Sequence, residues 1–230
     1  MTQTIYIAGD STAALKGASD KPMTGWGEYL QAYFNPMIHV DNRAVNGRST
    51  KSFLHERRLS HIENDFKAGD YLFIQFGHND SKEEDPNRYT DPDHEYRINL
   101  LQFIHTARKH GGTPVLLTSV SRLRFTEDGT PDPLAVGRYP EAMREVAQAS
   151  GTPLLDIFAS SQQLFHSLGE EACKPLFMHL PELAHPNYPD GIADNTHFSE
   201  YGAQRIARLV VDSILQSPDL RALRQHLVGE

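Results

Sequence analysis

The amino-acid sequence predicts an α/β fold in which helices cover both faces of a five-stranded parallel sheet. Short apolar runs alternate with segments of helical periodicity along the 230 residues, and strands that are separated by helices pair in parallel. The 39% hydrophobic content is sufficient for a sizeable core and excludes a disordered chain. Because no repeat or interdomain linker interrupts the pattern, residues 1–230 are predicted to form one domain.

Five apolar segments have the composition of short buried strands. They span residues 5–8, 37–45, 71–76, 114–118 and 153–157. The first runs directly into Gly9, and the third follows a turn at Gly69-Asp70. In a parallel sheet the ligand crevice lies outside the carboxyl ends of the strands, so the loops after the first four strands are expected at one edge.

Helical periodicity is found between these strands. Helices are predicted over residues 24–34, 49–66, 94–110, 139–149 and 200–215. Gly111-Gly112 and Gly151 follow two of them, as is common at helix C-termini. Residues 175–189 contain four prolines and show neither a helical nor a strand period. This segment is expected to be a loop that walls one side of the site.

Composition and charge exclude several classes of protein. The net charge of −8 argues against general affinity for nucleic acid or anionic membrane surfaces, and no apolar stretch approaches the roughly 20 residues needed to cross a bilayer. The first nine residues do not resemble a secretory signal. Cys173 is the single cysteine, so no intrachain disulfide can form. A cytoplasmic location is therefore expected, unless a signal sequence has been removed.

Four short polar motifs lie where chemistry is expected. They are Gly9-Asp10-Ser11, Asn46-Gly47-Arg48-Ser49, Gly77-His78-Asn79-Asp80 and Asp194-Asn195-Thr196-His197. Each of the first three follows a predicted strand, which places it at the carboxyl edge of the sheet. The chemistry of the motifs and the topology of the sheet therefore indicate the same edge.

Together the motifs contain the groups that an acyl-enzyme hydrolase requires. Ser11 can act as the nucleophile and His197 as its base, while Asp194 can hold the histidine ring. The backbone N–H groups of Ser11 and Gly47, with the side chain of Asn79, can stabilise an oxyanion. Each residue alone has an ordinary alternative, such as a helix N-cap, a turn or a loop asparagine. The four motifs in this order outweigh those alternatives.

The chain resembles the SGNH (GDSL-type) hydrolase superfamily and, within it, the rhamnogalacturonan acetylesterase branch. Ser, Gly, Asn and His name the superfamily, and this chain matches them with Ser11, Gly47, Asn79 and His197. Asp194 matches the acidic residue of the Asp-x-x-His block. The stretches that resemble the branch are residues 9–12, 25–30, 46–53, 75–80, 139–140 and 194–198.

The resemblance implies a flavodoxin-like three-layer α/β/α fold and the removal of acetyl groups from pectic polysaccharide. We therefore predict a serine esterase that removes O-acetyl groups from pectic (rhamnogalacturonan) oligosaccharides through an acyl-enzyme, with no metal and no organic cofactor. One stretch departs from the branch. Residues 118–125 read Thr-Ser-Val-Ser-Arg-Leu-Arg-Phe where Thr-Pro-Val-x-Arg-Arg-x-Phe is expected, which weakens the inference about substrate contacts.

Four further residues are predicted to contact the acetylated oligosaccharide. They are Trp26, Arg48, Arg122 and Arg124. A galacturonate-containing substrate is anionic while the chain is itself negative, so any attraction must come from local cations on the loops of the catalytic edge. The alternative is that the arginines are ordinary surface cations. The expected cytoplasmic location favours short oligosaccharides over intact polymer.

Other functions remain open at this point. An acetylxylan esterase, or an esterase for other carbohydrates or small esters, would use the same residues. A metal-dependent phosphoesterase also has a Gly-Asp after a strand, but its later Gly-Asn-His order is reversed here in Gly77-His78-Asn79, and no Asp-x-His lies near the first strand. A silent carbohydrate-binding protein is disfavoured, because it would not need Ser11, Asp194 and His197 together.

Overall fold

Five parallel strands form the central sheet of the computed structural model, which describes residues 2–228. Their order across the sheet is β2-β1-β3-β4-β5, which is the flavodoxin-like order. The strands are β1 (Gln3–Gly9), β2 (Ile38–Asn42), β3 (Tyr71–Gln75), β4 (Thr113–Leu117) and β5 (Leu154–Leu155). Every neighbouring pair is parallel. The predicted five-stranded parallel sheet is confirmed.

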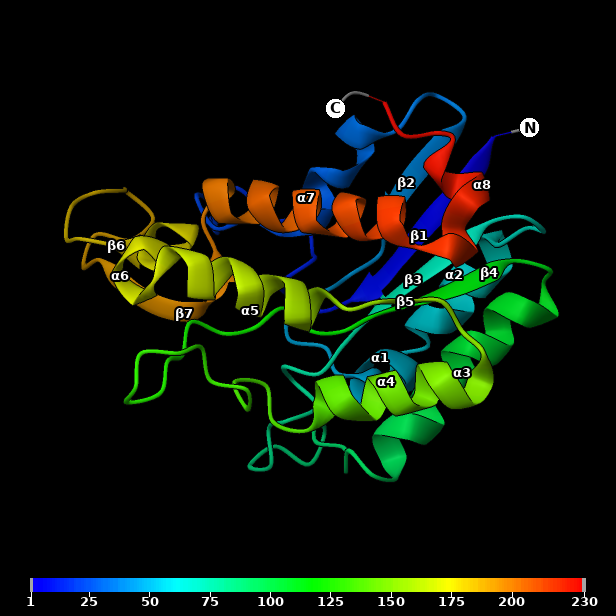
Figure 1. The fold of residues 1–230 in the computed structure, drawn as a ribbon, viewed down its shortest axis with the longest axis horizontal. Coiled ribbons are helices and arrows are strands. Elements are labelled where there is room, and N and C mark those ends of the chain that lie inside the picture. The colour runs from blue at the N-terminus through cyan, green and yellow to red at the C-terminus, as the bar shows by residue number, and fades with distance from the viewer. Residues whose placement is uncertain (1, 229–230) are drawn as a thin grey trace.

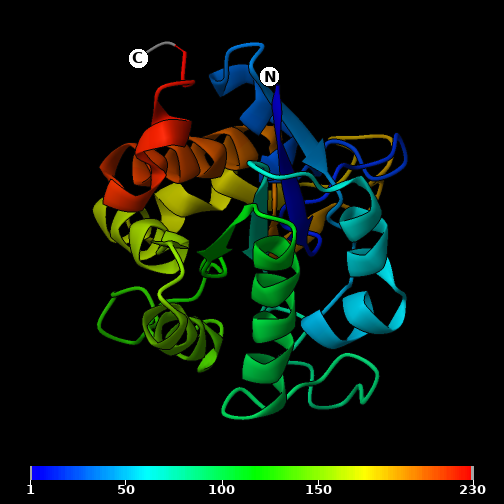
Figure 2. The same ribbon diagram turned by 90° about the vertical axis from the view of Figure 1, so that its right-hand side faces the viewer.

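Helices cover both faces of this sheet and give the molecule three layers (Figures 1 and 2). One face packs against α1 (Thr50–His55), α2 (Arg58–Asp65), α3 (Glu95–Lys109) and α4 (Tyr139–Ser150). The other packs against α5 (Ile157–Leu168), α7 (Glu200–Gln216) and two 3₁₀ helices, η1 (Trp26–Glu28) and η2 (Leu30–Tyr33). In Figure 1, α5 and α7 lie on the opposite side of the sheet from α3 and α4. The expected three-layer α/β/α fold is confirmed.

Alternate side chains of β1 enter two separate cores. Ile5 and Ile7 of β1 belong to the core under α5 and α7, whereas Tyr6 and Ala8 belong to the core under α1 to α4. All four are buried. A strand that is covered on both faces reads as a continuous apolar run, which is why the sequence shows one here. The loop after β1 is therefore anchored by packing on both sides.

Two segments expected to be single helices are divided in the structure. The helix expected over residues 49–66 breaks between α1 and α2 at Arg57, whose φ of 56° is left-handed. The helix expected over residues 24–34 is instead the pair η1 and η2. A Cβ at Gly25 would lie 2.3 Å from the carbonyl oxygen of Ala14. This segment is therefore shaped by close packing on the loop that follows β1.

The last third of the chain contains elements that the sequence pattern did not predict. The Asp156 side chain accepts a hydrogen bond from the N–H of Ala159 at 3.2 Å and so caps α5. Because α5 begins at Ile157, β5 is reduced to two residues instead of residues 153–157. Shorter elements are α6 (Glu170–Cys173), η3 (Lys174–Leu176), η4 (Pro218–Leu220) and α8 (Arg221–Arg224). Within residues 2–228, no helix has both the length and the apolar character needed to cross a membrane.

The sequence predicts an irregular loop over residues 175–189, but part of this segment is a strand. They contain β6 (Phe177–Leu180), which pairs antiparallel with β7 (Ile192–Phe198) in a second, two-stranded sheet. A four-residue strand among prolines is too short to show a period. β7 carries Asp194 and His197, so these two residues lie in a strand.

Candidate active site

Ser11, His197 and Asp194 form one chain of hydrogen bonds. The Ser11 Oγ lies 2.9 Å from His197 Nε2, and His197 Nδ1 lies 2.7 Å from Asp194 Oδ2. Ser11 lies two residues after the end of β1 and remains 8% exposed, while the other two residues come from β7 near the other end of the chain. The fold thus brings together the three side chains that the sequence assigned to nucleophile, base and carboxylate.

An irregularity in β7 lets Asp194 and His197 meet on one side of the strand. Side chains three residues apart in a regular strand point to opposite faces. Here Met178 of β6 pairs with Asp194, but Phe177 pairs with Phe198, so the residues between them bulge out of the ladder. Asp194 Oδ1 secures the bulge by accepting the N–H groups of Thr196 at 2.7 Å and His197 at 3.0 Å.

The charge of Asp194 decides which nitrogen of His197 carries the proton. Burial raises the pKa of Asp194, but the hydrogen bonds from the His197 ring and from the backbone N–H groups of His197 and Thr196 outweigh it and bring that pKa to about 2. The ionised carboxylate can only accept, so the neutral ring donates from Nδ1. Nε2 is then free to accept the proton of Ser11.

Three donors are available to an oxyanion at the ends of β1, β2 and β3. Within residues 2–228 the backbone N–H groups of Ser11 and Gly47 have no hydrogen-bond partner. Gly47 has a φ of 75°, and a Cβ built there would touch nothing within 4 Å. Asn79 Nδ2 donates one hydrogen to Arg48 O at 3.1 Å, and its Oδ1 accepts from Arg88 at 3.2 Å. These bonds orient the amide and leave its second N–H unused.

Hydrogen bonds to the Asp80 side chain hold the loop that carries Asn79. The buried Asp80 carboxylate accepts hydrogen bonds from Thr50 N, from Thr50 Oγ1 at 2.5 Å and from Thr90 Oγ1 at 2.8 Å. Burial raises the pKa of Asp80 to about 7, although these hydrogen bonds oppose the shift. The Asp80 side chain therefore joins the loop that carries Asn79 to Thr50 and Thr90.

Arg122 is held against the same loop by a neutral histidine. Its Nε donates to His78 Nδ1 at 3.3 Å and its Nη2 to the His78 carbonyl at 3.2 Å. Burial lowers the pKa of His78 to about 4, so the ring is uncharged at neutral pH and Nδ1 can accept. Within residues 2–228 Arg122 forms no ion pair. Its guanidinium charge is thus available to a ligand.

A small cleft of about 140 Å³ lies over these residues. Its lining consists of Ser11, His78, Asn79, Lys82, Arg122, Asp194, Thr196 and His197. Of the four predicted substrate contacts, only Arg122 lines it. Lys82 was missed by the sequence reasoning, although it is a basic residue two positions after the Gly-His-Asn-Asp motif. No residue of the 175–189 segment lines the cleft, so the expected wall is absent there.

Trp26 cannot contact a substrate directly, contrary to the sequence prediction. Its side chain is 0% exposed, and its Nε1 donates to Gln75 Oε1 at 2.7 Å under the β1 loop. Trp26 is the largest side chain in the core on this side of the sheet. The glycines on either side of Trp26 allow close packing on the backbone of Ala13 and Ala14, and the ring is buried.

Arg48 and Arg124 face carboxylates of the protein itself. Arg48 pairs with Glu56 at 3.1 Å, and its Nη1 donates to the Asn46 carbonyl at 2.8 Å. That carbonyl belongs to the same peptide group as the Gly47 N–H, so the cation polarises this donor. Arg124 pairs with Asp132 at 2.6 Å and lies outside the cleft lining.

Among the described residues no three His, Cys, Asp or Glu side chains are grouped so as to hold a metal ion. The groups brought together at this edge are instead a hydroxyl, an imidazole, a carboxylate and several N–H donors. Such a set can transfer an acyl group to serine and release it to water.

Comparisons with known proteins agree with this chemistry. The model of the GDSL-like Lipase/Acylhydrolase family matches residues 7–205. Over 227 residues the chain is 42% identical to the rhamnogalacturonan acetylesterase RhgT of Bacillus subtilis, covering 98% of this chain and 94% of that protein. It is 37% identical to the probable rhamnogalacturonan acetylesterase YesY of the same species, covering 93% of both.

A solved structure is similar as well. The crystal structure of the protein YxiM from Bacillus subtilis superposes with a TM-score of 0.80 at 26% sequence identity. The match covers 94% of this chain but only 57% of the YxiM chain, so this chain spans little more than half of that protein.

Proposed function

The chain belongs to the GDSL-like lipase/acylhydrolase family, and we propose that it is a serine esterase that removes O-acetyl groups from pectic (rhamnogalacturonan) oligosaccharides. The hydrogen-bonded chain from Ser11 through His197 to Asp194 is the observation that carries the reaction type. Two relatives named as rhamnogalacturonan acetylesterases, at 42% and 37% identity, support the choice of substrate.

The first half of the proposed reaction forms an acetyl-enzyme. His197 Nε2 takes the proton of Ser11 as its Oγ bonds to the acetyl carbonyl carbon. The oxygen becomes an oxyanion that accepts hydrogen bonds from the Ser11 and Gly47 N–H groups and from Asn79; loss of one such donor typically costs about 10²–10³ in kcat. The carbonyl re-forms, the ester C–O bond breaks, and His197 protonates the departing sugar hydroxyl.

In the second half of the reaction, water takes the place of the sugar hydroxyl and releases the acetyl group from Ser11. His197 removes a proton from a water molecule, whose oxygen attacks the acetyl-serine carbonyl. The same donors stabilise the second oxyanion, and its collapse breaks the bond to Ser11 Oγ. The imidazolium returns the proton to Ser11, and acetate leaves. Throughout, the Asp194 carboxylate stabilises the charged ring.

The neighbourhood of the cleft supports an anionic substrate. Arg122 lines the cleft and also a second cavity of about 490 Å³, so the two are adjacent. Arg124 and Arg138 line that second cavity too, but they pair with Asp132 and Asp93. The unpaired guanidinium of Arg122 is thus placed to bind a uronate carboxylate next to the acetylated sugar.

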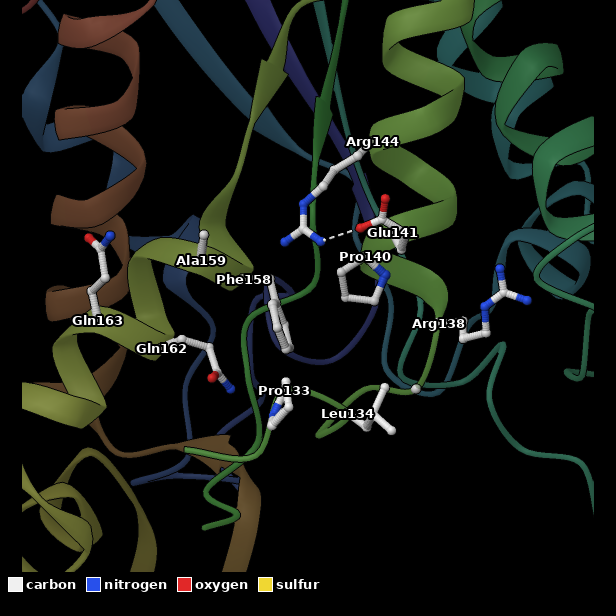
Figure 3. Close-up of a pocket in the computed structure, with 11 residues that line it drawn as sticks. Pro133, Leu134, Arg138, Pro140, Glu141, Arg144, Phe158, Ala159, Gln162 and Gln163 are labelled. Carbon is white, nitrogen blue, oxygen red and sulfur yellow. Dashed lines mark hydrogen bonds and ion pairs between the residues drawn. The ribbon is translucent and has the colours of Figure 1, made fainter. Parts of the chain in front are cut away.

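A third cavity of about 700 Å³ continues beyond the second and shares Leu134, Gly137 and Arg138 with it. Figure 3 shows Phe158, Pro133 and Pro140 around this cavity, while Arg138 extends away from the other lining side chains. The three cavities together are compatible with an oligosaccharide that extends past the acetylated residue.

The Arg122→Gln variant should discriminate between charged and neutral substrates. We expect KM for acetylated rhamnogalacturonan fragments to rise about ten-fold, since one charge-assisted hydrogen bond contributes roughly 1.5–3 kcal/mol. Hydrolysis of neutral p-nitrophenyl acetate should change little. Arg124→Gln is the matched control, because Arg124 is neutralised by Asp132. Equal effects of Arg122→Gln on both substrates would argue against carboxylate binding.

Acetate release from four substrates tests the proposed function as a whole. The substrates are short acetylated rhamnogalacturonan fragments, the corresponding polymer, acetylated xylan and a medium-chain p-nitrophenyl ester, compared per ester group. We expect the highest kcat/KM on the short fragments. A preference for xylan or for the medium-chain ester would replace the substrate assignment with one of the sister esterases.

A cytoplasmic location is part of this proposal. Cys173 is the single cysteine, which permits a reducing compartment, and burial raises the pKa of its thiol to about 11. In that compartment the enzyme would meet short fragments after import. A preference for the polymer in the comparison above would contradict the location while leaving the reaction type in place.

A further inference from the structure

Lys16 is a buried cation directly behind the nucleophile. The residue is only 4% exposed, and its ammonium group donates hydrogen bonds to the Ser11 carbonyl and, at 2.7 Å, to Asn46 Oδ1. A third, longer contact of 3.4 Å reaches the Ala14 carbonyl. Within residues 2–228 it forms no ion pair with a carboxylate. A buried lysine whose partners are neutral is rare, because removing the charge from water is costly.

The contacts of Lys16 join the two loops that carry the backbone donors of the oxyanion. Ser11 follows β1, and Asn46 immediately precedes Gly47 in the loop after β2. These strands are parallel neighbours in the sheet. One ammonium group therefore links the nucleophile loop to the Gly47 loop at the point where both leave the sheet.

The charged groups around Lys16 come from three places. Asp10 is the first residue after β1, Asp20 and Lys21 lie further along the same loop, and Glu28 lies in η1. Glu28 is already engaged, since it accepts Lys21 Nζ at 2.7 Å and the Lys16 backbone N–H at 3.1 Å. Burial lowers the pKa of Lys16 to about 8, although Asp10, Glu28 and Asp20 oppose the shift.

We propose that Lys16 is a positioning residue whose ammonium group sets the distance between the Ser11 and Gly47 loops, so that their N–H groups reach one oxyanion, and adds positive charge behind them. The proposal rests on the esterase function given above. Lys16 does not line the cleft, so it acts through Ser11 and Asn46 and not on the substrate.

This role predicts a specific kinetic signature. The oxyanion exists only in the tetrahedral states, so a misplaced donor weakens transition-state stabilisation without weakening ground-state binding. Lys16→Met should lower kcat on p-nitrophenyl acetate about ten-fold or more while KM stays within about two-fold. Lys21→Met is the matched control: it removes a neighbouring cation of the same loop that touches neither Ser11 nor Asn46, and kcat should be retained.

The wild-type pH profile provides a second readout. As the pH rises through about 8, Lys16 loses its charge, so kcat should fall on the alkaline side, and this limb should be absent from Lys16→Met. Lys16→Arg should move the limb to higher pH, because arginine stays protonated. Lys16→Arg also serves as the test variant if the methionine variant does not fold.

As the pH rises above about 8, the contribution of Lys16 to stability should increase while kcat falls. The pKa of Lys16 is lower in the folded than in the unfolded chain, where it is near 10.4. Between those values the unfolded chain binds more protons, so the contribution of Lys16 to stability rises with pH. The Tm difference between wild type and Lys16→Met should therefore move in favour of the wild type from pH 7.5 to 9.5. A Tm difference that moves in favour of Lys16→Met over this range would contradict a lowered pKa of Lys16 in the folded chain.

The outcomes separate this proposal from the function on which it rests. A folded Lys16→Met variant with wild-type kcat, or an alkaline limb that is unchanged in Lys16→Met and Lys16→Arg, would overturn the positioning role alone. A wild-type protein without esterase activity would overturn the proposed function and this role with it. A kcat loss confined to the Lys16 variants, with KM unchanged and the limb displaced, is the result that supports it.

Discussion

Replacing Ser11 or His197 by alanine is expected to lower kcat for p-nitrophenyl acetate by roughly 10⁴- to 10⁶-fold. Ser11→Ala removes the atom that bonds to the acetyl carbon, and His197→Ala removes the ring nitrogen that lies 2.9 Å from that atom and takes its proton. Because the two act as a unit, the double variant should be scarcely less active than either single one. Initial-rate kinetics on purified proteins measures all three values.

Both variants should keep the fold. In the structure the Ser11 Oγ bonds only to His197, so its removal leaves no buried donor or acceptor unpaired beyond that ring. Circular dichroism and thermal unfolding check this. His179→Ala is a matched control, since His179 lies on β6 and bonds Asn195 at 2.7 Å without reaching the cleft. Near-wild-type kcat in either Ser11→Ala or His197→Ala would refute the nucleophile–base assignment.

Asp194→Asn should lower kcat by about 10³- to 10⁴-fold, which is less than the loss in Ser11→Ala. The ionised carboxylate accepts the Nδ1–H of His197 at 2.7 Å and so keeps Nε2 unprotonated. An amide NH₂ in the same place would donate to Nδ1 and favour the tautomer that presents a proton to Ser11. The asparagine oxygen can still accept the N–H groups of Thr196 and His197, so the bulge should persist.

The matched control for this variant is Asp190→Asn. Asp190 is an exposed carboxylate that lies two residues before β7. Comparison of kcat for the two asparagine variants isolates the effect of the His197 partner from that of net charge. If Asp194→Asn retained activity within about ten-fold of the wild type, another group would have to orient the ring.

The sheet and the nucleophile loop could be predicted from the sequence because their signals are local. β1, β3 and β4 are short apolar runs buried on both faces, and each is followed by polar residues. Because parallel strands end at a common edge of the sheet, the sequence alone places Ser11, Gly47 and Asn79 together. Only the order of the strands and the lengths of the elements required the structure.

Predicted substrate contacts were wrong where the sequence does not show which partner a side chain finds in the fold. Trp26 was predicted to contact the substrate, but its side chain is buried and its Nε1 donates to Gln75 of β3. Arg48 was predicted to contact the substrate, but it pairs with Glu56, the residue directly after α1. In both cases the deciding partner is a polar side chain whose position has no periodic signature.

The sequence by itself determined the α/β class, the edge of the sheet where the chemistry lies, and the identity of the residues proposed for it, because residue type and strand periodicity are encoded in neighbouring positions. The tertiary structure alone decided how the residues meet. The β7 bulge that turns Asp194 and His197 to one side depends on pairing with β6, and the contact between Lys16 and Asn46 depends on β1 and β2 lying side by side. Pairing register and cross-loop contacts join residues far apart in the chain, so they exist only once the whole fold has formed.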